Sequence, residues 1–236
     1  MNRFFQWRFA PKRKDASSPP QSGIGLYFYV LVTHFWKFVT LNLLLVAFAL
    51  PVVTLPAAIC AVNRVFILLI REGNCFLWDD FFKEFRSSFR KSLLMGLLFG
   101  VGIAAGYYLV SLGLSNGQSI FGVLFLATGL FLSIGAALLG SWTFVLLAML
   151  PLRCADVLKN ARALTGLEGK RDIAIFATHA AVLAFTLMLL PFYLIPLPLF
   201  LLSLAQYTVC FLVNTAVQQR VIAPFEAAQK AKEALQ

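Results

Sequence analysis

Charged residues are scarce in this chain, and they are absent from three long stretches. Only 13% of the 236 residues are charged, about half the usual share for a soluble domain. The three uncharged stretches lie between Lys37 and Arg64, between Lys91 and Arg153, and between Asp172 and Arg220. Each of the last two has room for two apolar helices of about 20 residues with a turn between them. With 60% hydrophobic residues and a mean hydropathy of +0.83, the composition is that of a membrane protein.

Motifs for catalysis, nucleotide binding and metal binding are also missing. The sequence contains no GxxxxGK followed by Ser or Thr, and no GxGxxG. It offers no nucleophile beside a base and no paired carboxylates at one membrane depth. Its four cysteines are far apart and form no CxxC pair or Cys/His cluster. We therefore expect no catalytic residues, no cofactor and no metal site, and we predict that the protein is not an enzyme.

The basic residues that are present gather in four places. They lie before the first predicted span, in two of the connections between spans, and after the last span. The turns between these clusters, PVVTLP, SLGLSNGQS and LPFYLIPLP, carry no charge. Under the positive-inside rule this alternation predicts a multi-pass protein with both termini in the cytoplasm. Because the same rule accounts for the net charge of +10, nucleic-acid binding is not expected.

These patterns predict an all-α fold, a polytopic bundle of about six transmembrane helices. The spans are expected near 35–50, 54–70, 92–113, 119–150, 173–190 and 197–218, in a single transmembrane domain over residues 26–220. Pro51 and Pro56 separate the first two, because two prolines five residues apart seldom lie in one straight helix. The stretch 119–150 would extend about 48 Å as a helix, so it must tilt, kink or project beyond a hydrocarbon layer of about 30 Å.

The two ends of the chain are predicted to be cytoplasmic. Residues 1–25 form a basic, aromatic segment that suits an anionic leaflet, and residues 221–236 form a tail. The N-terminal segment has no apolar core of 7 to 15 residues, so it is not a cleavable signal peptide.

Residues 79–91, DDFFKEFRSSFRK, carry aromatic and basic side chains on separate faces of a helix. At about 100° per residue, four phenylalanines fall within an arc of roughly 100° and three basic residues in a neighbouring arc of roughly 60°. The two groups are Phe81, Phe82, Phe85 and Phe89, and Lys83, Arg86 and Arg90. We predict an interfacial helix whose phenylalanines face the acyl boundary or the bundle, while its basic residues meet lipid phosphates of the anionic cytoplasmic leaflet.

Asn63 and Arg64 lie inside a predicted span, where a charged side chain needs a partner or a path to water. No Asp or Glu lies in any predicted span to pair with Arg64. Two interpretations stay open. These residues, with His179 from the fifth span, would bind a lipid phosphate or a substrate carboxylate. Alternatively, Arg64 snorkels toward the cytoplasmic headgroups, and His179 bonds to a protein partner.

Small residues at helical spacing mark the third predicted span. Gly96 and Gly100, and then Gly102 and Gly106, form two GxxxG pairs that face different directions. Such pairs let helix backbones approach closely. They predict contacts with two neighbouring helices inside the bundle, with a homo-oligomer as the alternative.

Two segments together resemble a known family. They are ALPVVTLPAAICAVNRVFILLI and WDDFFKEFRSSFRKSLLMGLL, within residues 42–98. In these segments the chain is similar to the YesL-like family of bacterial integral membrane proteins, a domain-of-unknown-function family. The resemblance implies a multi-pass protein of the bacterial cytoplasmic (inner) membrane, with an association with sugar uptake and no assigned catalytic mechanism.

Three functions fit the sequence. The first is a non-enzymatic accessory or regulatory partner of a transport system, which would bind transporter subunits as well as lipids. The second is a small-solute transporter or permease component with its ligand near Arg64 and His179. The third is a protein that handles lipids or other parts of the cell envelope through its basic cytoplasmic face. A dry, packed bundle would favour the first, and a wet cavity at Arg64 the second.

Overall fold

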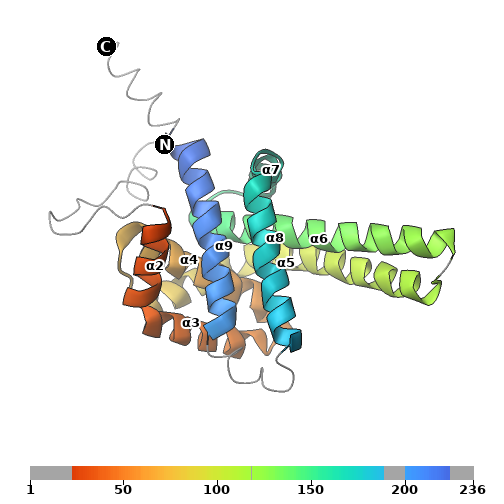
Figure 1. The fold of residues 1–236 in the computed structure, drawn as a ribbon. Helices are drawn as coiled ribbons and strands as arrows, with labels where there is room; N and C mark the ends of the chain where they lie inside the picture. The colour runs from red at the N-terminus through yellow and green to blue at the C-terminus, as the bar shows by residue number, and fades with distance from the viewer. Residues whose placement is uncertain (1–22, 118, 189–199, 224–236) are drawn as a thin grey trace, which may run out of the picture.

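The fold was analysed in a computed structural model, which describes residues 23–117, 119–188 and 200–223. Over these residues the chain is helical with no β-strand, which confirms the all-α prediction (Figure 1). The elements are α2 (Ile24–Thr33), α3 (Phe35–Ala49), η1 (Val52–Thr54), α4 (Leu55–Glu72), α5 (Leu77–Ser115), α6 (Ile120–Met149), α7 (Cys154–Leu167), α8 (Gly169–Met188), α9 (Leu202–Val217) and the π-helical η4 (Gln218–Ile222). Most of the predicted N-terminal segment, the uncharged turn LPFYLIPLP and nearly all of the tail lie outside the described residues.

The α4 helix forms the centre of the bundle. It packs against α3, α5, α6 and α9, and side chains on nearly all of its faces are buried. Pro56 lies in its first turn, where a missing N–H costs no helical hydrogen bond. At the other end Gly73 has a φ of 72°, and its N–H caps the helix on the Leu69 carbonyl.

The break between α3 and α4 falls at the two prolines, as predicted. The α3 helix ends at Ala49, and a single 3₁₀ turn carries the chain into α4. The Thr54 hydroxyl donates to the carbonyl oxygen of Phe48 and, at 2.8 Å, to that of Pro51. The bond to Phe48 satisfies a carbonyl that loses its helical partner at the end of α3.

The predicted interfacial helix at residues 79–91 is not a separate element. It forms the first part of α5, a single helix of 39 residues. The reason is local, because the sequence from Leu77 to Met95 contains neither Gly nor Pro and so has no residue that stops a helix. The amphipathic segment and the third predicted span are therefore one continuous helix.

Glycines hold α5 and α6 together as a long antiparallel hairpin. A Cβ atom added at Gly129 would lie 2.6 Å from the Gly106 carbonyl oxygen and 2.7 Å from the Val110 nitrogen. One at Gly113 would lie 2.8 Å from the Gly122 oxygen. The two backbones therefore touch, and no other residue type fits between them. In Figure 1 this hairpin projects to the right, whereas α8 and α9 run down the view.

The two predicted GxxxG pairs contribute unequally to these contacts. Gly96 faces Pro56 of α4, whereas Gly102 and Gly106 face α6, so the helix does meet two neighbours as expected. Gly100 faces open space.

Four helices in the described residues are long and apolar enough to cross a membrane. They are Val52–Glu72, Leu77–Ser115, Ile120–Met149 and Gly169–Met188. The α2–α3 pair would make a fifth, although its two helices meet at a bend of 79°. The α-helical part of α9 has 16 residues, and π-helical turns continue it on both sides, over residues 200–201 and 218–222. These helices fit a membrane protein, and the six-span arrangement remains a prediction.

Candidate functional site: the polar groups around the central helix

A line of polar side chains joins α4 to α9. Asn63 is fully buried, and its Oδ1 accepts hydrogen bonds from Gln206 Nε2 at 2.6 Å and from Cys210 Sγ at 3.1 Å. Two helical turns further along α4, Arg71 Nε donates to Asn214 Oδ1 at 2.8 Å. The three α9 partners are spaced four residues apart, so they form one stripe on that helix.

Several other polar groups in the core also bond to neighbouring helices. Asn42 Oδ1 on α3 accepts from the Ser203 backbone N–H at 2.7 Å. Tyr27 on α2 shares a 2.9 Å hydrogen bond with Thr208, and Tyr207 donates to the Tyr27 carbonyl oxygen at 3.1 Å. Buried polar groups are stable only when bonded in this way. The core amides of α3, α4 and α9 therefore act as connections between helices.

Arg64 lies next to Asn63 in sequence but faces a different neighbour. Its guanidinium reaches the Ala148 carbonyl oxygen on α6 at 3.5 Å, and its side chain is partly buried. Asn63, in contrast, faces α9. Both residues thus contact protein groups, but Arg64 contacts α6 and Asn63 contacts α9.

His179 lies on a third contact surface, between α8 and α6. Its Nδ1 lies 2.8 Å from the Ile175 carbonyl oxygen one turn earlier, and its Nε2 lies 3.5 Å from the Ser141 hydroxyl. Asn63 therefore contacts α9, and Arg64 contacts α6. His179 contacts its own helix, α8, and also α6. A joint ligand-binding role for the three remains a prediction.

The phenylalanine face of residues 79–91 packs on the bundle. Phe81 is fully buried, and Phe48 from α3 lies against Phe81, Phe82 and Phe85 at ring-centroid distances of 5.8, 5.9 and 4.9 Å. Phe89 continues the row at 5.9 Å from Phe85. Of the two orientations left open by the sequence, these contacts favour the one in which the aromatic face meets protein.

The basic face of the same segment is exposed. Lys83, Arg86 and Arg90 all lie on the surface of α5. Two shallow hollows follow this face, and Arg86 and Ser87 line both of them. Aromatic atoms of Phe82 and Phe85 form part of their walls. Exposed cations above apolar walls suit an anionic partner with an apolar part.

Glu84 is a buried acidic residue that the sequence pattern did not single out. It lies between the exposed cations in sequence, yet only 9% of its surface is exposed, and its carboxylate accepts a hydrogen bond from Ser88. In the sequence, the burial of Glu84 is indicated only by its position four residues before Ser88, on the side of the helix opposite Arg86. A charge-rich segment does not by itself reveal which charge is turned inward.

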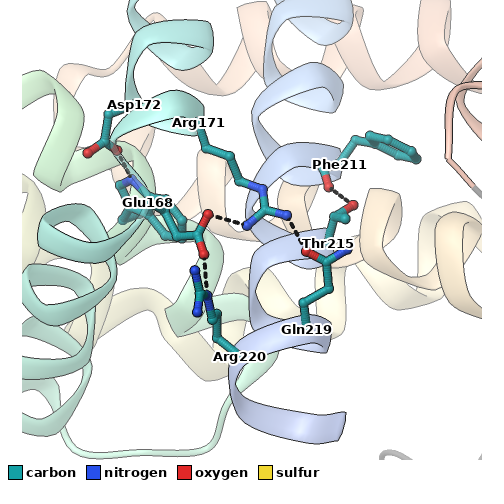
Figure 2. Close-up of polar contacts among 8 residues, drawn as sticks. Glu168, Arg171, Asp172, Phe211, Thr215, Gln219 and Arg220 are labelled. Atoms are coloured by element: carbon teal, nitrogen blue, oxygen red, sulfur yellow. Dashed lines mark hydrogen bonds and ion pairs between the residues drawn. The ribbon is translucent and has the colours of Figure 1, made fainter.

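A second polar cluster joins the α7–α8 turn to the end of α9 (Figure 2). The Glu168 carboxylate pairs with Arg171 at 2.5 Å and with Arg220 at 2.6 Å, and Arg171 donates to Gln219 Oε1 at 2.6 Å. The hydrogen bond from Arg220, with the charge of Arg171, lowers the pKa of the Glu168 carboxyl. Sequence analysis found the basic residues here but missed the shared carboxylate and the α7 helix before it.

A third contact holds the bend between α2 and α3 on the α4–α5 turn. Lys37 Nζ donates to Asn74 Oδ1 at 2.7 Å and to the Cys75 carbonyl oxygen at 3.3 Å. His34 Nε2 lies 3.0 Å from the Gly73 carbonyl oxygen. These groups lie at the ends of α3 and α4 that the sequence analysis predicts to be cytoplasmic.

Comparison with known proteins finds one family and no individual relative. Residues 38–108 match the family described as "Protein of unknown function, DUF624". This range covers nearly all of α3, the whole of α4 and α5 as far as Tyr108. No curated protein and no solved structure matches the chain. The match agrees with the resemblance to a domain-of-unknown-function family in the same stretch, and the narrower YesL-like assignment remains a prediction. Over its central helices the chain is thus similar to a family of proteins of unknown function.

Proposed function

We propose that the protein is a non-enzymatic membrane protein that acts as an accessory or regulatory partner of a transport system. The main support is the use of polar groups around α4. Asn63 and Arg71 bond to side chains of α9, and Arg64 reaches the backbone of α6. These groups hold helices together, which is what a packed scaffold needs. Sugar uptake as the process follows only from the family resemblance.

The exposed basic face of α5 is the surface we propose for the partner. Lys83, Arg86 and Arg90 stand on a helix whose other face is fixed to the bundle by Phe81 and Phe85. A rigid helix of this kind presents the cations without a cost in ordering the backbone, so that only their side chains lose freedom on binding. In this proposal the face lies in the cytoplasm of a bacterium, with both termini on the same side of the inner membrane.

Co-purification from the native membrane in mild detergent tests this role. Wild-type protein is expected to recover a transporter subunit, and the variant Lys83→Ser/Arg86→Ser/Arg90→Ser is expected to lose it. The matched control is Lys159→Ser/Arg162→Ser, which removes exposed cations from α7 instead. Failure of the wild type to recover any transporter subunit, under conditions that preserve known transporter complexes, would rule out the proposal.

One observation favours a small-solute transporter as the second candidate. Asn63 Nδ2 is buried and has no hydrogen-bond partner among the described residues. An unbonded buried amide is the kind of group that a ligand or a water molecule satisfies. Uptake of labelled sugars into vesicles containing the purified protein alone would support this candidate, and Asn63→Leu should then abolish uptake while α4 stays folded.

A further inference from the structure

The α5 helix has two halves with different surfaces. Its first half, up to Lys91, carries all of the helix's charges, including the exposed Lys83, Arg86 and Arg90. From Leu97 to the end of the helix there is no charge. Large apolar side chains stand exposed in this second half, for example Leu97 at 65% and Val101 at 61%. A single helix thus passes from a surface suited to water and phosphate to one suited to hydrocarbon.

Contacts with α4 and α6 show which half lies beside the core. Pro56 in the first turn of α4 lies against Gly96. The chain direction of α4 then leads back along the charged half of α5, because α4 continues into the turn before Leu77. On α6, Cys60 and Arg64 of α4 meet the carbonyls of Phe144 and Ala148, in its last turns. The α4 helix therefore begins level with Gly96 and runs away from the apolar half of α5.

The remaining parts of α5 and α6 form an arm, which comprises residues 97–115 and 120–138. Each of its two helical segments has 19 residues, about 28 Å at 1.5 Å per residue, close to the roughly 30 Å of a hydrocarbon layer. Its tip, SNG at residues 115–117, is polar and exposed. Beyond the core-side end of the arm, Lys91 Nζ donates to the carbonyl oxygen of Leu152, which follows α6, at 3.2 Å. The arm thus has the length of one membrane hairpin, with a polar tip and with a charged residue of α5, Lys91, six residues before its core-side end.

We propose that this arm crosses the hydrocarbon layer, and that α4 lies beside the charged half of α5 at the cytoplasmic edge of that layer. If α4 itself crossed the layer, the exposed Lys83, Arg86 and Arg90 would lie at its depth, where charged side chains are costly. With the arm in the layer, the same cations reach the headgroup phosphates. This placement departs from the six-span prediction and does not depend on a transport partner.

Lipid, and not a second copy of the chain, is the occupant that the arm's surface fits. Helix interfaces within membranes use small residues that allow close approach. Most glycines of the arm, among them Gly106, Gly113 and Gly129, face the contact between its own two helices, whereas Gly100 and Gly135 face outward. Bulky side chains such as Phe121 at 69% and Phe131 at 82% exposure point outward instead. Acyl chains adapt to such a surface, whereas a second rigid helix would leave gaps.

Spin labels at single cysteines measure the depth of each half in vesicles of phosphatidylethanolamine and phosphatidylglycerol. The partly exposed Cys75 and Cys154 are first replaced by serine, and the buried Cys60 and Cys210 are kept. Labels are then placed by Ser87→Cys on the charged half and by Val101→Cys or Phe131→Cys on the arm, all at exposed positions.

At both arm positions, the collision rate of the spin label with oxygen is expected to exceed its collision rate with a water-soluble nickel chelate several-fold. At Ser87→Cys, the collision rate with oxygen is expected to be the lower of the two. A Ser87 label as deep as the Val101 label would overturn the proposal and restore α4 as a crossing helix. Arm labels that favour the nickel chelate would also overturn it. Arm labels shielded from both reagents, with spin–spin broadening that unlabelled protein removes, would show a second copy in place of lipid.

Discussion

The α4 helix and the α5–α6 arm are both apolar, yet they meet their surroundings in opposite ways. In the most apolar stretch around α4, 61% of residues are buried within the protein, against 17% in α5 and 11% in α6. The α4 helix carries Asn63, Arg64 and Arg71, each in contact with another helix, whereas the arm carries no charge. Hydropathy marks both regions as candidate spans. Packing separates them, because other helices cover most of α4 whereas most of the arm's surface is exposed.

The largest predicted effect comes from filling the contact between the two helices of the arm. Gly129→Ala would place a Cβ atom 2.6 Å from the Gly106 carbonyl oxygen, a backbone atom that moves only if the hairpin opens. We expect a loss of about 3 kcal/mol in the free energy of unfolding. Thermal unfolding in detergent measures this loss.

Gly100→Ala is the matched control for the arm, because a Cβ at Gly100 meets nothing within 4 Å. We expect this variant to be as stable as the wild type or to gain up to about 1 kcal/mol from helix propensity. Equal losses in the two variants would contradict the close approach of the backbones.

The next effect concerns the core. Asn63→Leu removes the acceptor of Gln206 and leaves that partly buried amide without this bond, so we expect a loss of about 1–3 kcal/mol. The double variant Asn63→Leu/Gln206→Leu removes both polar groups, and its stability should recover part of the loss. A double variant whose loss of stability equals the sum of the losses in Asn63→Leu and Gln206→Leu would show that the groups do not interact. Chemical unfolding of the three variants provides the comparison.

The smallest effect is expected at Glu168, outside both regions. Glu168→Gln weakens the pairs with Arg171 and Arg220, and we expect a loss of about 0.2–1 kcal/mol at neutral pH. Because the folded pKa of Glu168 is lowered, its contribution is complete above the ordinary glutamate value of about 4.3. The contribution is lost as the pH falls through the lowered value. The stability difference between wild type and variant should therefore vanish in acid, and a difference that persists there would point to another cause.

Sequence patterns predicted several local features of this fold. Pro51 and Pro56 marked the break before α4, and the amides Asn42, Gln206 and Asn214, which lie in the uncharged stretches of the sequence, bond between helices. Each of these features depends on a residue type whose chemistry is nearly independent of the fold.

Other features depend on contacts that no short stretch contains. Residues 79–91 were expected to form an interfacial helix leading into the third span, whereas the structure makes both one helix because no residue there ends it. Glu84 was not distinguished from its charged neighbours, since its burial depends on α4 and the rest of the core. The excess length of the stretch 119–150 was recognised, and the structure supplies its reason: the last turns of α6 are buried against α4, as the contact of Arg64 with Ala148 shows.

The contacts of α9 impose an order on biosynthesis. Thr208 and Ser203 bond to Tyr27 and Asn42, which precede them by 181 and 161 residues. The ribosome therefore releases α2, α3 and α4 long before the helix that completes their hydrogen bonds. Until α9 emerges, the amides of these early helices must be satisfied by water, by lipid headgroups or by the insertion machinery. Maturation of the core is thus a late event, and a nascent chain stalled before residue 200 should stay sensitive to protease.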